Sequence, residues 1–337
     1  MKILITGGAG FIGSNLCEYF VKQGYDVVCL DNLSTGFIHN IKHLMVCDNF
    51  QFIEGDIRDL IVCGRAIRGC DVVLHEAALG SVPRSINDPI STNATNIDGF
   101  LNMLVAARDE GVKRFVYAAS SSTYGDSKEL PKIEHNIGRP MSPYAITKFV
   151  NELYANVFAS LYGLETIGLR YFNVFGPRQN PNGAYAAVIP LWVKMLLKHE
   201  SPFINGDGSY SRDFTYIDNV IQANELAATI SHDDIVKKAL LYNMNLPNNA
   251  PIDLVFNVAY GGNTTLNDLY NCLRDNLAKF DPEILNIVPQ YREARAGDVP
   301  HSQASIIKAQ RILGYNPKYS ALEGFELACK WYYNNLR

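Results

Sequence analysis

Three glycines between a short apolar run and a helix-like run near the amino end constrain the fold of this chain more than any other feature. Residues 1–6 are apolar enough to form a buried strand, and Gly7, Gly10 and Gly13 follow that strand before a predicted helix over 11–23. Glycine allows a tight turn and a close approach to a pyrophosphate, whose charge then lies at the helix N-terminus. This order predicts the first unit of a parallel α/β sheet that binds a dinucleotide. A glycine pattern alone is often only a turn, so the next strand has to support it.

The second predicted strand, over 26–30, ends at Asp31. A carboxylate in that place accepts hydrogen bonds from the adenosine ribose hydroxyls and repels a 2′-phosphate, which favours NAD over NADP as the cofactor. The residues that we expect to hold the cofactor around these two turns are Gly7, Gly10, Phe11, Ile12, Gly13, Asp31, Asn32, Ser34, Thr35 and Gly36.

The composition is that of a globular protein. With 337 residues, of which 47% are apolar, the chain is long enough to bury a large core. A net charge of −4 without a basic block argues against a nucleic-acid partner, and no apolar run is long enough for a membrane span or a signal peptide. The seven cysteines and seven histidines show neither a disulfide framework nor metal-ligand spacing. We therefore expect a cytoplasmic protein without a metal site.

Strand-like and helix-like segments alternate as far as residue 173. This alternation predicts a Rossmann-type, doubly wound parallel sheet whose ligand lies at the carboxyl ends of the strands. The further predicted strands cover 50–54, 72–76, 114–119 and 166–170, and the predicted helices between them include 93–110 and 144–162. From residue 174 the pattern loosens into stretches rich in Pro, Gly and Asn. We expect an NAD-binding domain over 1–173, to which parts of the later chain return, and a smaller α/β substrate lobe formed mainly by 174–337.

The residues that directly follow the predicted strands are further candidates for the cofactor site. Asp56 can meet the adenine, and Ala77 and Ala78 are small enough for the cofactor to pass over them, although tight packing explains small residues equally well. The set expected from these strand ends is Asp56, Ile57, Ala77, Ala78, Leu79 and Tyr171.

Tyr144 and Lys148 are one helical turn apart in the predicted helix over 144–162, so they lie on the same helix face. The ammonium of Lys148 can lower the pKa of the phenol from about 10 and make the phenolate available as a base for chemistry on an alcohol. Among 19 tyrosines about one such pair arises by chance, and an exposed helix face is the alternative. The upstream serine run, residues 120–122, supports the catalytic interpretation.

Two arginines in the later half can hold a diphosphate through bidentate hydrogen bonds if they converge on one cleft. They are Arg212, within the segment 211–214, and Arg295, which is followed by Asp298. The alternative, with equal weight, is a pair of surface ion pairs.

Longer strings of residues carry a more specific signal than the glycine spacing. The segments 78–89 (ALGSVPRSINDP), 96–103 (NIDGFLNM) and 182–190 (NGAYAAVIP) resemble signatures of the extended short-chain dehydrogenase/reductases, and within them of the nucleotide-sugar 4-epimerases. The resemblance covers essentially the whole chain. It is closer to the branch that acts on UDP-N-acetylglucosamine and UDP-N-acetylgalactosamine, or on their uronic acids, in surface polysaccharide synthesis.

The resemblance implies a catalytic role for each of five residues. Tyr144 would take the proton of the sugar 4-hydroxyl while hydride passes from C4 to NAD, and Lys148 would bind the nicotinamide ribose. One serine of the run Ser120, Ser121 and Ser122 would form a hydrogen bond with the 4-oxygen. The spacing back from Tyr124 favours Ser120 for this role and places Ser122 toward the sugar. The sequence alone does not decide between Ser120 and Ser122. The 4-keto sugar would rotate and take the hydride back on its other face, with NAD retained. Related dehydratases and decarboxylases carry acidic side chains where this chain has Ser121 and Ser122, which favours epimerisation.

The resemblance also implies a substrate site and a homodimer. Epimerases restricted to unsubstituted hexoses have a bulky aromatic residue where this chain has Ser302, and serine leaves room for an N-acetyl group at C2, unless Ser302 is an ordinary loop residue. The family pairs the helices over 93–110 and 144–162 of two subunits. The implied residues for the UDP-sugar are Gly80, Ser81, Ser122, Asn173, Gln179, Ala187, Val188, Asn205, Arg212, Arg295, Asp298 and Ser302.

Alternatives remain open at this point. The sugar could be the uronic acid, with Arg84 or Arg178 reading its carboxylate, or plain UDP-glucose and UDP-galactose. Other classes of function are an NAD-binding sensor without turnover and an alcohol dehydrogenase that exchanges NAD with solvent. Between about residues 238 and 251 the chain resembles an insertion, and the turn formers in 246–251 predict a surface loop. Of the two strand-like runs beside it, 241–244 and 255–258, the second fits the family pattern better.

Overall fold

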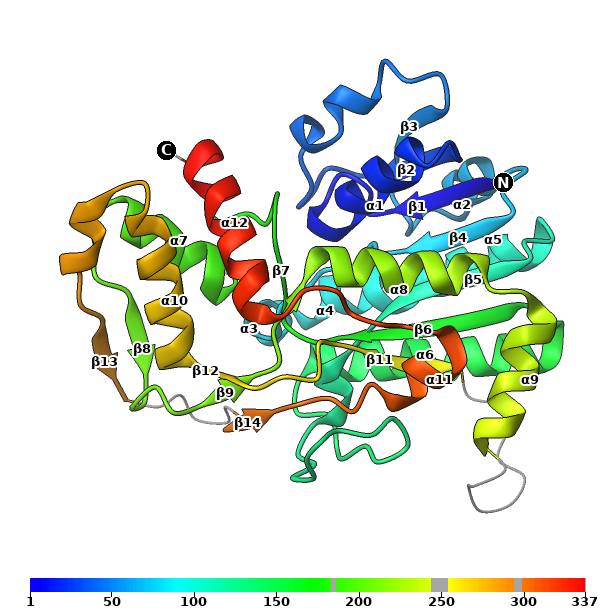
Figure 1. The fold of residues 1–337 in the computed structure, drawn as a ribbon. Coiled ribbons are helices and arrows are strands. Elements are labelled where there is room, and N and C mark those ends of the chain that lie inside the picture. Colours follow the sequence, from blue (N-terminus) through cyan, green and yellow to red (C-terminus); the bar gives the residue numbers. More distant parts are fainter. Residues whose placement is uncertain (183–185, 244–253, 294–298, 337) are drawn as a thin grey trace.

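A parallel sheet forms the centre of the molecule (Figure 1). The computed structural model describes residues 1–182, 186–243, 254–293 and 299–336. Within these ranges seven strands form one sheet in the order β11, β6, β5, β4, β1, β2, β3. They are β1 (Lys2–Thr6), β2 (Asp26–Asp31), β3 (Phe50–Glu54), β4 (Val72–His75), β5 (Arg114–Ser120), β6 (Glu165–Tyr171) and β11 (Val255–Val258). Because β2 and β4 flank β1, the strand order reverses at β1, which is where such sheets bind ligands.

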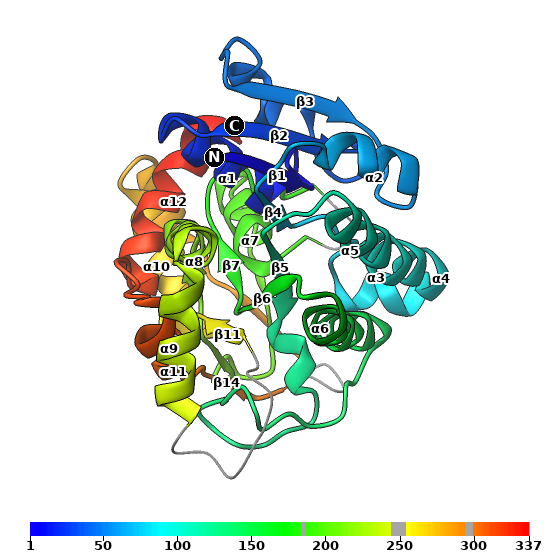
Figure 2. The same cartoon turned by 90° about the vertical axis from the view of Figure 1, so that its right-hand side faces the viewer.

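Side chains of β1 alternate between two cores, one on each face of the sheet. Ile3 and Ile5 belong to a core shared with α1, α8, α9 and α11, whereas Leu4 belongs to a core shared with α2, α5 and α6. Figure 2 shows these two helical layers on either side of the strands. The helices are α1 (Phe11–Lys22), α8 (Ile217–Thr229), α9 (His232–Asn243) and α11 (Ile307–Leu313) on one face, and α2 (Leu60–Ile67), α5 (Gly99–Asp109) and α6 (Pro143–Tyr162) on the other.

A smaller lobe lies beside the carboxyl ends of the strands, on the left of Figure 1. Its helices are α7 (Val188–Leu197), α10 (Leu266–Ala278) and α12 (Ala321–Asn335). Its short strands are β8 (Phe203–Asn205) with β13 (Gln290–Arg292), and β9 (Ser211–Arg212) between β12 (Thr264–Thr265) and β14 (His301–Ser302). A further pair, β7 (Val174–Phe175) and β10 (Thr215–Tyr216), joins the lobe to the end of β6. The predicted fold class, a Rossmann-type sheet with a smaller α/β lobe, is confirmed.

One predicted helix differs from the observed elements, and the choice between two predicted strands is decided. The helix predicted over 93–110 is interrupted: α3 (Val82–Asn87) and α4 (Pro89–Asn93) precede a π-helical turn, Ala94–Asp98, before α5 begins. The run 241–243 continues α9, and β11 is the strand that pairs with β6, so the preference for the second run is confirmed. The predicted loop over 246–251 lies outside the described residues. In the described part of the chain no helix is long and apolar enough to cross a bilayer.

Candidate active site

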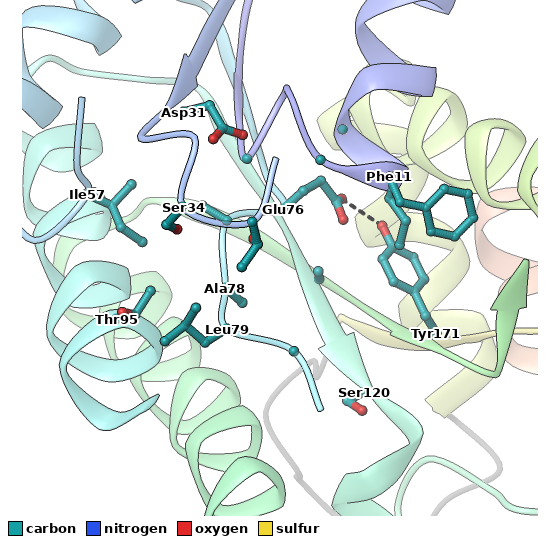
Figure 3. A pocket seen from close by; sticks show the side chains of 18 of the residues that line it. Phe11, Asp31, Ser34, Ile57, Glu76, Ala78, Leu79, Thr95, Ser120 and Tyr171 are labelled. Carbon is teal, nitrogen blue, oxygen red and sulfur yellow. Dashed lines mark hydrogen bonds between the residues drawn. The ribbon is translucent and has the colours of Figure 1, made fainter. Parts of the chain in front are cut away.

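A pocket of about 410 Å³ lies where the carboxyl ends of β1, β2, β4, β5 and β6 meet. Figure 3 shows it from close by, with side chains from these strand ends and from the helices beside them pointing inward. All the residues predicted to hold the cofactor line this pocket except Gly36 and Asp56. The structure therefore brings together the two halves of the prediction, the glycine turn and the Tyr144–Lys148 pair.

The glycine turn fits a dinucleotide because it leaves no room for side chains. Gly7 has φ +66°, and a Cβ there would lie 2.8 Å from the backbone of Ala77. A Cβ on Gly13 would lie 2.2 Å from the carbonyl oxygen of Gly7. The turn is thus packed against the end of β4 and against the first turn of α1, whose free N–H groups are available to an anion.

Asp31 is fixed by the same turn. Its two carboxylate oxygens accept hydrogen bonds from the N–H groups of Ala9 (2.9 Å) and Leu33 (2.8 Å). Burial raises the pKa of Asp31, and these backbone donors act against that rise. Because each oxygen has a second lone pair, the carboxylate can still accept from ribose hydroxyls. Gly36 does not line the pocket but packs on the turn, since a Cβ there would lie 2.8 Å from the carbonyl carbon of Ala9.

Asp56 lies beside the pocket rather than in its wall. Its carboxylate accepts hydrogen bonds from Arg58 (2.7 Å) and from the Asn32 amide (2.9 Å). The hydrogen bonds from Arg58 lower the pKa of Asp56 to about 2. The neighbouring Ile57 does line the pocket, so an adenine contact by Asp56 stays a prediction.

The catalytic helix begins at a fixed point. Ser142 caps α6 by accepting a hydrogen bond from the N–H of Ala145 (3.1 Å), and Pro143 occupies the first turn. One turn later Lys148 is 3% exposed, and its ammonium donates to the carbonyl oxygen of Ala118 at 2.7 Å. This bond uses one of three N–H groups, so two remain for a ligand.

The serine run is resolved by its hydrogen bonds. The Ser120 hydroxyl lies close enough to the phenol of Tyr144 to lower the pKa of that phenol. It also accepts from the backbone N–H of Ser122 (3.2 Å) and from the Ser122 hydroxyl (2.9 Å). Ser120 lines the pocket, whereas Ser121 and Ser122 do not. Ser120 is therefore the serine beside the phenol, and Ser122 lies behind it.

The expected lowering of the phenol pKa is wrong for the side chains as they stand. Burial raises the pKa of Tyr144, the hydrogen bond from Ser120 lowers it, and the charge of Glu76 raises it further. Burial also lowers the pKa of Lys148 to about 8, so the ammonium is itself only weakly favoured. A cationic ligand group beside Tyr144 would be needed to bring the phenolate within reach of neutral pH.

The residues predicted for the substrate are spread more widely. Gly80 and Asn173 line the pocket, and the Asn173 amide donates to the carbonyl oxygen of Asp213 at 3.1 Å. Ser81 caps α3, and the Gln179 amide donates to the carbonyl oxygen of Val174. Five others that the structure describes lie on the smaller lobe outside this pocket: Ala187 and Val188 at the start of α7, Asn205 at the end of β8, and Arg212 opposite Ser302 across β9 and β14.

The diphosphate prediction is tested only in part. The Arg212 guanidinium donates to the carbonyl oxygens of Ser211 (2.9 Å) and Pro300 (3.1 Å). Arg295 and Asp298 lie outside the described residues, so their convergence with Arg212 stays a prediction.

Among the pocket residues that sequence reasoning missed, two have polar side chains, Glu76 and Thr95, and both are labelled in Figure 3. Thr95 lies in the π-helical turn, which no sequence pattern indicated. Glu76 was placed inside the predicted strand 72–76, but β4 ends at His75. A strand end one residue earlier would have revealed it. Among the described residues no group of three or more His, Cys, Asp or Glu is placed to hold a metal ion.

The sequence and the fold match known proteins over their whole length. A sequence model of the NAD dependent epimerase/dehydratase family matches residues 3–240. The UDP-glucose 4-epimerase of Mycolicibacterium smegmatis is 32% identical over 336 residues, which covers 99% of each chain. One similar solved structure is that of the UDP-N-acetylglucosamine 4-epimerase of Methanobrevibacter ruminantium in complex with UDP-N-acetylmuramic acid. It is 34% identical in sequence with a TM-score of 0.86, and the match covers 99% of this chain and 98% of that one. The UDP-glucose 4-epimerase of Thermotoga maritima, with UDP-glucose, is 36% identical with a TM-score of 0.85, and 100% of each chain is covered.

Proposed function

The chain belongs to the NAD-dependent epimerase/dehydratase family, and on that premise we propose that it interconverts UDP-N-acetylglucosamine and UDP-N-acetylgalactosamine by epimerisation at C4. The observation that carries the proposal is the meeting of Ser120, Tyr144 and Lys148 in the pocket that the glycine turn opens. These groups suit proton removal from a secondary alcohol. The presence of both Tyr144 and Lys148 argues against an NAD-binding sensor without turnover.

The mechanism follows from the positions of these side chains. Tyr144 removes the proton of the sugar 4-hydroxyl, and Ser120, which lies beside the same phenol, donates a hydrogen bond to the 4-oxygen. Bound NAD supplies the acceptor for the C4 hydride and its return. Lys148 would hold the cofactor ribose with the two N–H groups that its bond to Ala118 leaves available. Because Ser121 and Ser122 are not acids, the site offers no group there for elimination, and the 4-keto sugar is reduced again.

The N-acetylhexosamine is favoured over the other sugars by two features. Ser302 is small, and a solved relative with 34% identity is a UDP-N-acetylglucosamine 4-epimerase. The uronic acid alternative loses one candidate partner, because the Arg178 guanidinium donates to Glu18 and Asn15 of α1, each at 2.6 Å. UDP-glucose stays the second candidate, since the Thermotoga maritima relative acts on it and is 36% identical.

Proton NMR tests the substrate directly. The purified protein, with no cofactor added, is incubated with UDP-N-acetylglucosamine, and the H4 coupling is followed as the equatorial hydroxyl becomes axial. Growth of the galacto signal to a steady ratio supports the proposal and shows that NAD is retained. Turnover of only UDP-glucose, or of only the uronic acid, keeps the mechanism and replaces the substrate. Accumulation of NADH favours the function of an alcohol dehydrogenase. No change in the spectrum of any of these sugars refutes the proposal that the protein is an enzyme.

We also propose a homodimer in which α6 packs against a second copy of the chain. Leu153, Val157 and Leu161 follow each other at intervals of four residues, so they form one stripe on α6, and they are 49%, 48% and 69% exposed. Val157→Asp should give a monomer in sedimentation at micromolar concentration. Leu240→Asp, at a 52% exposed position on α9, should leave the dimer intact. A monomer before any substitution contradicts the proposal.

A further inference from the structure

Glu76 is a carboxyl group in the pocket that the proposed reaction does not use. It directly follows β4, and its Oε1 accepts a hydrogen bond from the hydroxyl of Tyr171 at 2.8 Å, the dashed line in Figure 3. The amide of Asn224, on α8, donates to the same hydroxyl oxygen at 2.8 Å. The hydroxyl proton of Tyr171 is therefore used in the hydrogen bond to Glu76. Asn224 of α8 fixes the Tyr171 hydroxyl, and this hydroxyl in turn fixes the carboxyl group of Glu76.

The fold places Glu76 at the reacting end of the pocket. Asp31, which suits the adenosine ribose, ends β2, whereas β4, β5 and β6 lie on the other side of β1. Ser120 and Tyr171 are opposite each other in the register of β5 and β6. Ser120 lies beside the phenol of Tyr144, which takes the substrate proton, and the Tyr171 hydroxyl donates to Glu76. A nicotinamide that reaches the substrate at Tyr144 must consequently lie near Glu76.

The groups around Glu76 act in opposite directions on its pKa. Burial raises the pKa of Glu76 to about 7, against the hydrogen bond from Tyr171 and the charge of Lys148, which both lower it. Tyr144, also on α6, has its own pKa raised by Glu76. His75 before it is neutral, since burial lowers its pKa to about 3. The neighbouring side chains Asn224 of α8 and Phe11 of α1 do not titrate.

We propose that Glu76 sets the redox balance of the bound cofactor, because its carboxylate attracts the cationic ring of NAD⁺ and has no such attraction for the neutral ring of NADH. The structural basis is the carboxyl group of Glu76, which Tyr171 fixes in the same pocket that Tyr144 and Lys148 line. This role goes beyond the proposed function, since it holds for any sugar. Stronger binding of NAD⁺ than of NADH favours return of the hydride to the sugar. It also lowers the amount of protein that is left with NADH when a keto sugar dissociates.

Equilibrium binding of the two cofactor forms tests this role without any sugar present. Protein stripped of cofactor is titrated with NAD⁺ and with NADH between pH 6 and pH 8.5, and Kd(NADH)/Kd(NAD⁺) is compared. The ratio should rise as pH rises through about 7, because the carboxylate forms and strengthens NAD⁺ binding. Glu76→Gln keeps an acceptor for Tyr171 but cannot ionise, so above pH 7 it should lower the ratio about tenfold, the equivalent of one pKa unit, and remove the rise.

Two comparisons make the result decisive. Glu54→Gln removes an exposed carboxylate at the end of β3, outside the pocket, and should leave the ratio unchanged. If Glu76→Gln fails to bind either nucleotide, calorimetry of the unsubstituted protein at pH 7 in two buffers of different ionisation enthalpy replaces it. NAD⁺ binding should release protons from Glu76, and NADH binding should release fewer. An unchanged ratio in Glu76→Gln, or equal proton release for both nucleotides, overturns the proposal. Neither outcome bears on sugar epimerisation.

Discussion

The buried ion pair between Arg170 and Glu152 joins the catalytic helix to the sheet, and breaking it has a predictable cost. Arg170 lies on β6 and Glu152 on α6, one turn beyond Lys148, and their side chains are 3% and 5% exposed. Two parallel hydrogen bonds of 2.8 and 2.7 Å connect them, and a third, of 2.9 Å, joins Arg170 to the carbonyl oxygen of Glu134. The guanidinium also lies over the ring of Tyr124, with the carbon 4.9 Å from the ring centroid.

Arg170→Met removes the cation and, with it, the two buried hydrogen bonds that Arg170 donates to Glu152. Loss of one member of a buried pair typically lowers the free energy of unfolding by about 3–5 kcal/mol. Lys279→Met is the matched control, because Lys279 pairs with Glu326 at 2.8 Å but the two side chains are 56% and 63% exposed. An exposed pair of this kind contributes at most about 1 kcal/mol.

Urea unfolding of both variants at equal NAD concentration, followed by intrinsic fluorescence, measures the difference. Arg170→Met should unfold at clearly lower urea than Lys279→Met with an unchanged slope, which indicates a change in stability rather than in the surface exposed. A loss in Arg170→Met no larger than in Lys279→Met would refute the reasoning that burial makes this pair costly to break.

Three further predictions concern the site. Tyr144→Phe should lower kcat by about 10²–10⁴-fold while the protein keeps its NAD, and near-normal turnover contradicts the assignment of the base. Gly13→Ala should yield protein without NAD, because the new Cβ would lie 2.2 Å from the carbonyl oxygen of Gly7. The control Gly64→Ala should keep its NAD, because no atom lies within 4 Å of the new Cβ. The cofactor released on denaturation is quantified by absorbance. Burial lowers the pKa of Lys148 to about 8, so the ammonium is lost as pH rises through that value and kcat/KM should fall on the alkaline side. A profile that stays flat to about pH 10, near the ordinary pKa of lysine, argues against this role.

Much of the cofactor half of the molecule could be predicted because its signals are local. Gly7, Gly10 and Gly13 are required by backbone contacts within one turn, and Asp31 ends a strand that its apolar residues reveal. The parallel strands were found to within a residue or two, since buried strands are continuous apolar runs.

The parts that could not be predicted depend on long-range contacts. Whether Ser120 or Ser122 meets Tyr144 depends on how β5 approaches α6, and this is visible only in the folded chain. The pKa of Tyr144 was expected to fall, because the spacing showed Lys148 but did not show the extent of burial or the nearby Glu76. The π-helical turn at Ala94–Asp98 likewise has no sequence signature comparable to a glycine or a proline.

In the proposed reaction, hydride leaves C4 of a UDP-sugar and returns to the same carbon without exchange with water. UDP-N-acetylglucosamine carrying deuterium at C4, incubated in ordinary water, tests it by NMR and mass spectrometry of the product. The expected product is UDP-N-acetylgalactosamine that retains the deuterium at C4. Product with hydrogen at C4, or hydrogen exchange at C5 instead, would contradict it.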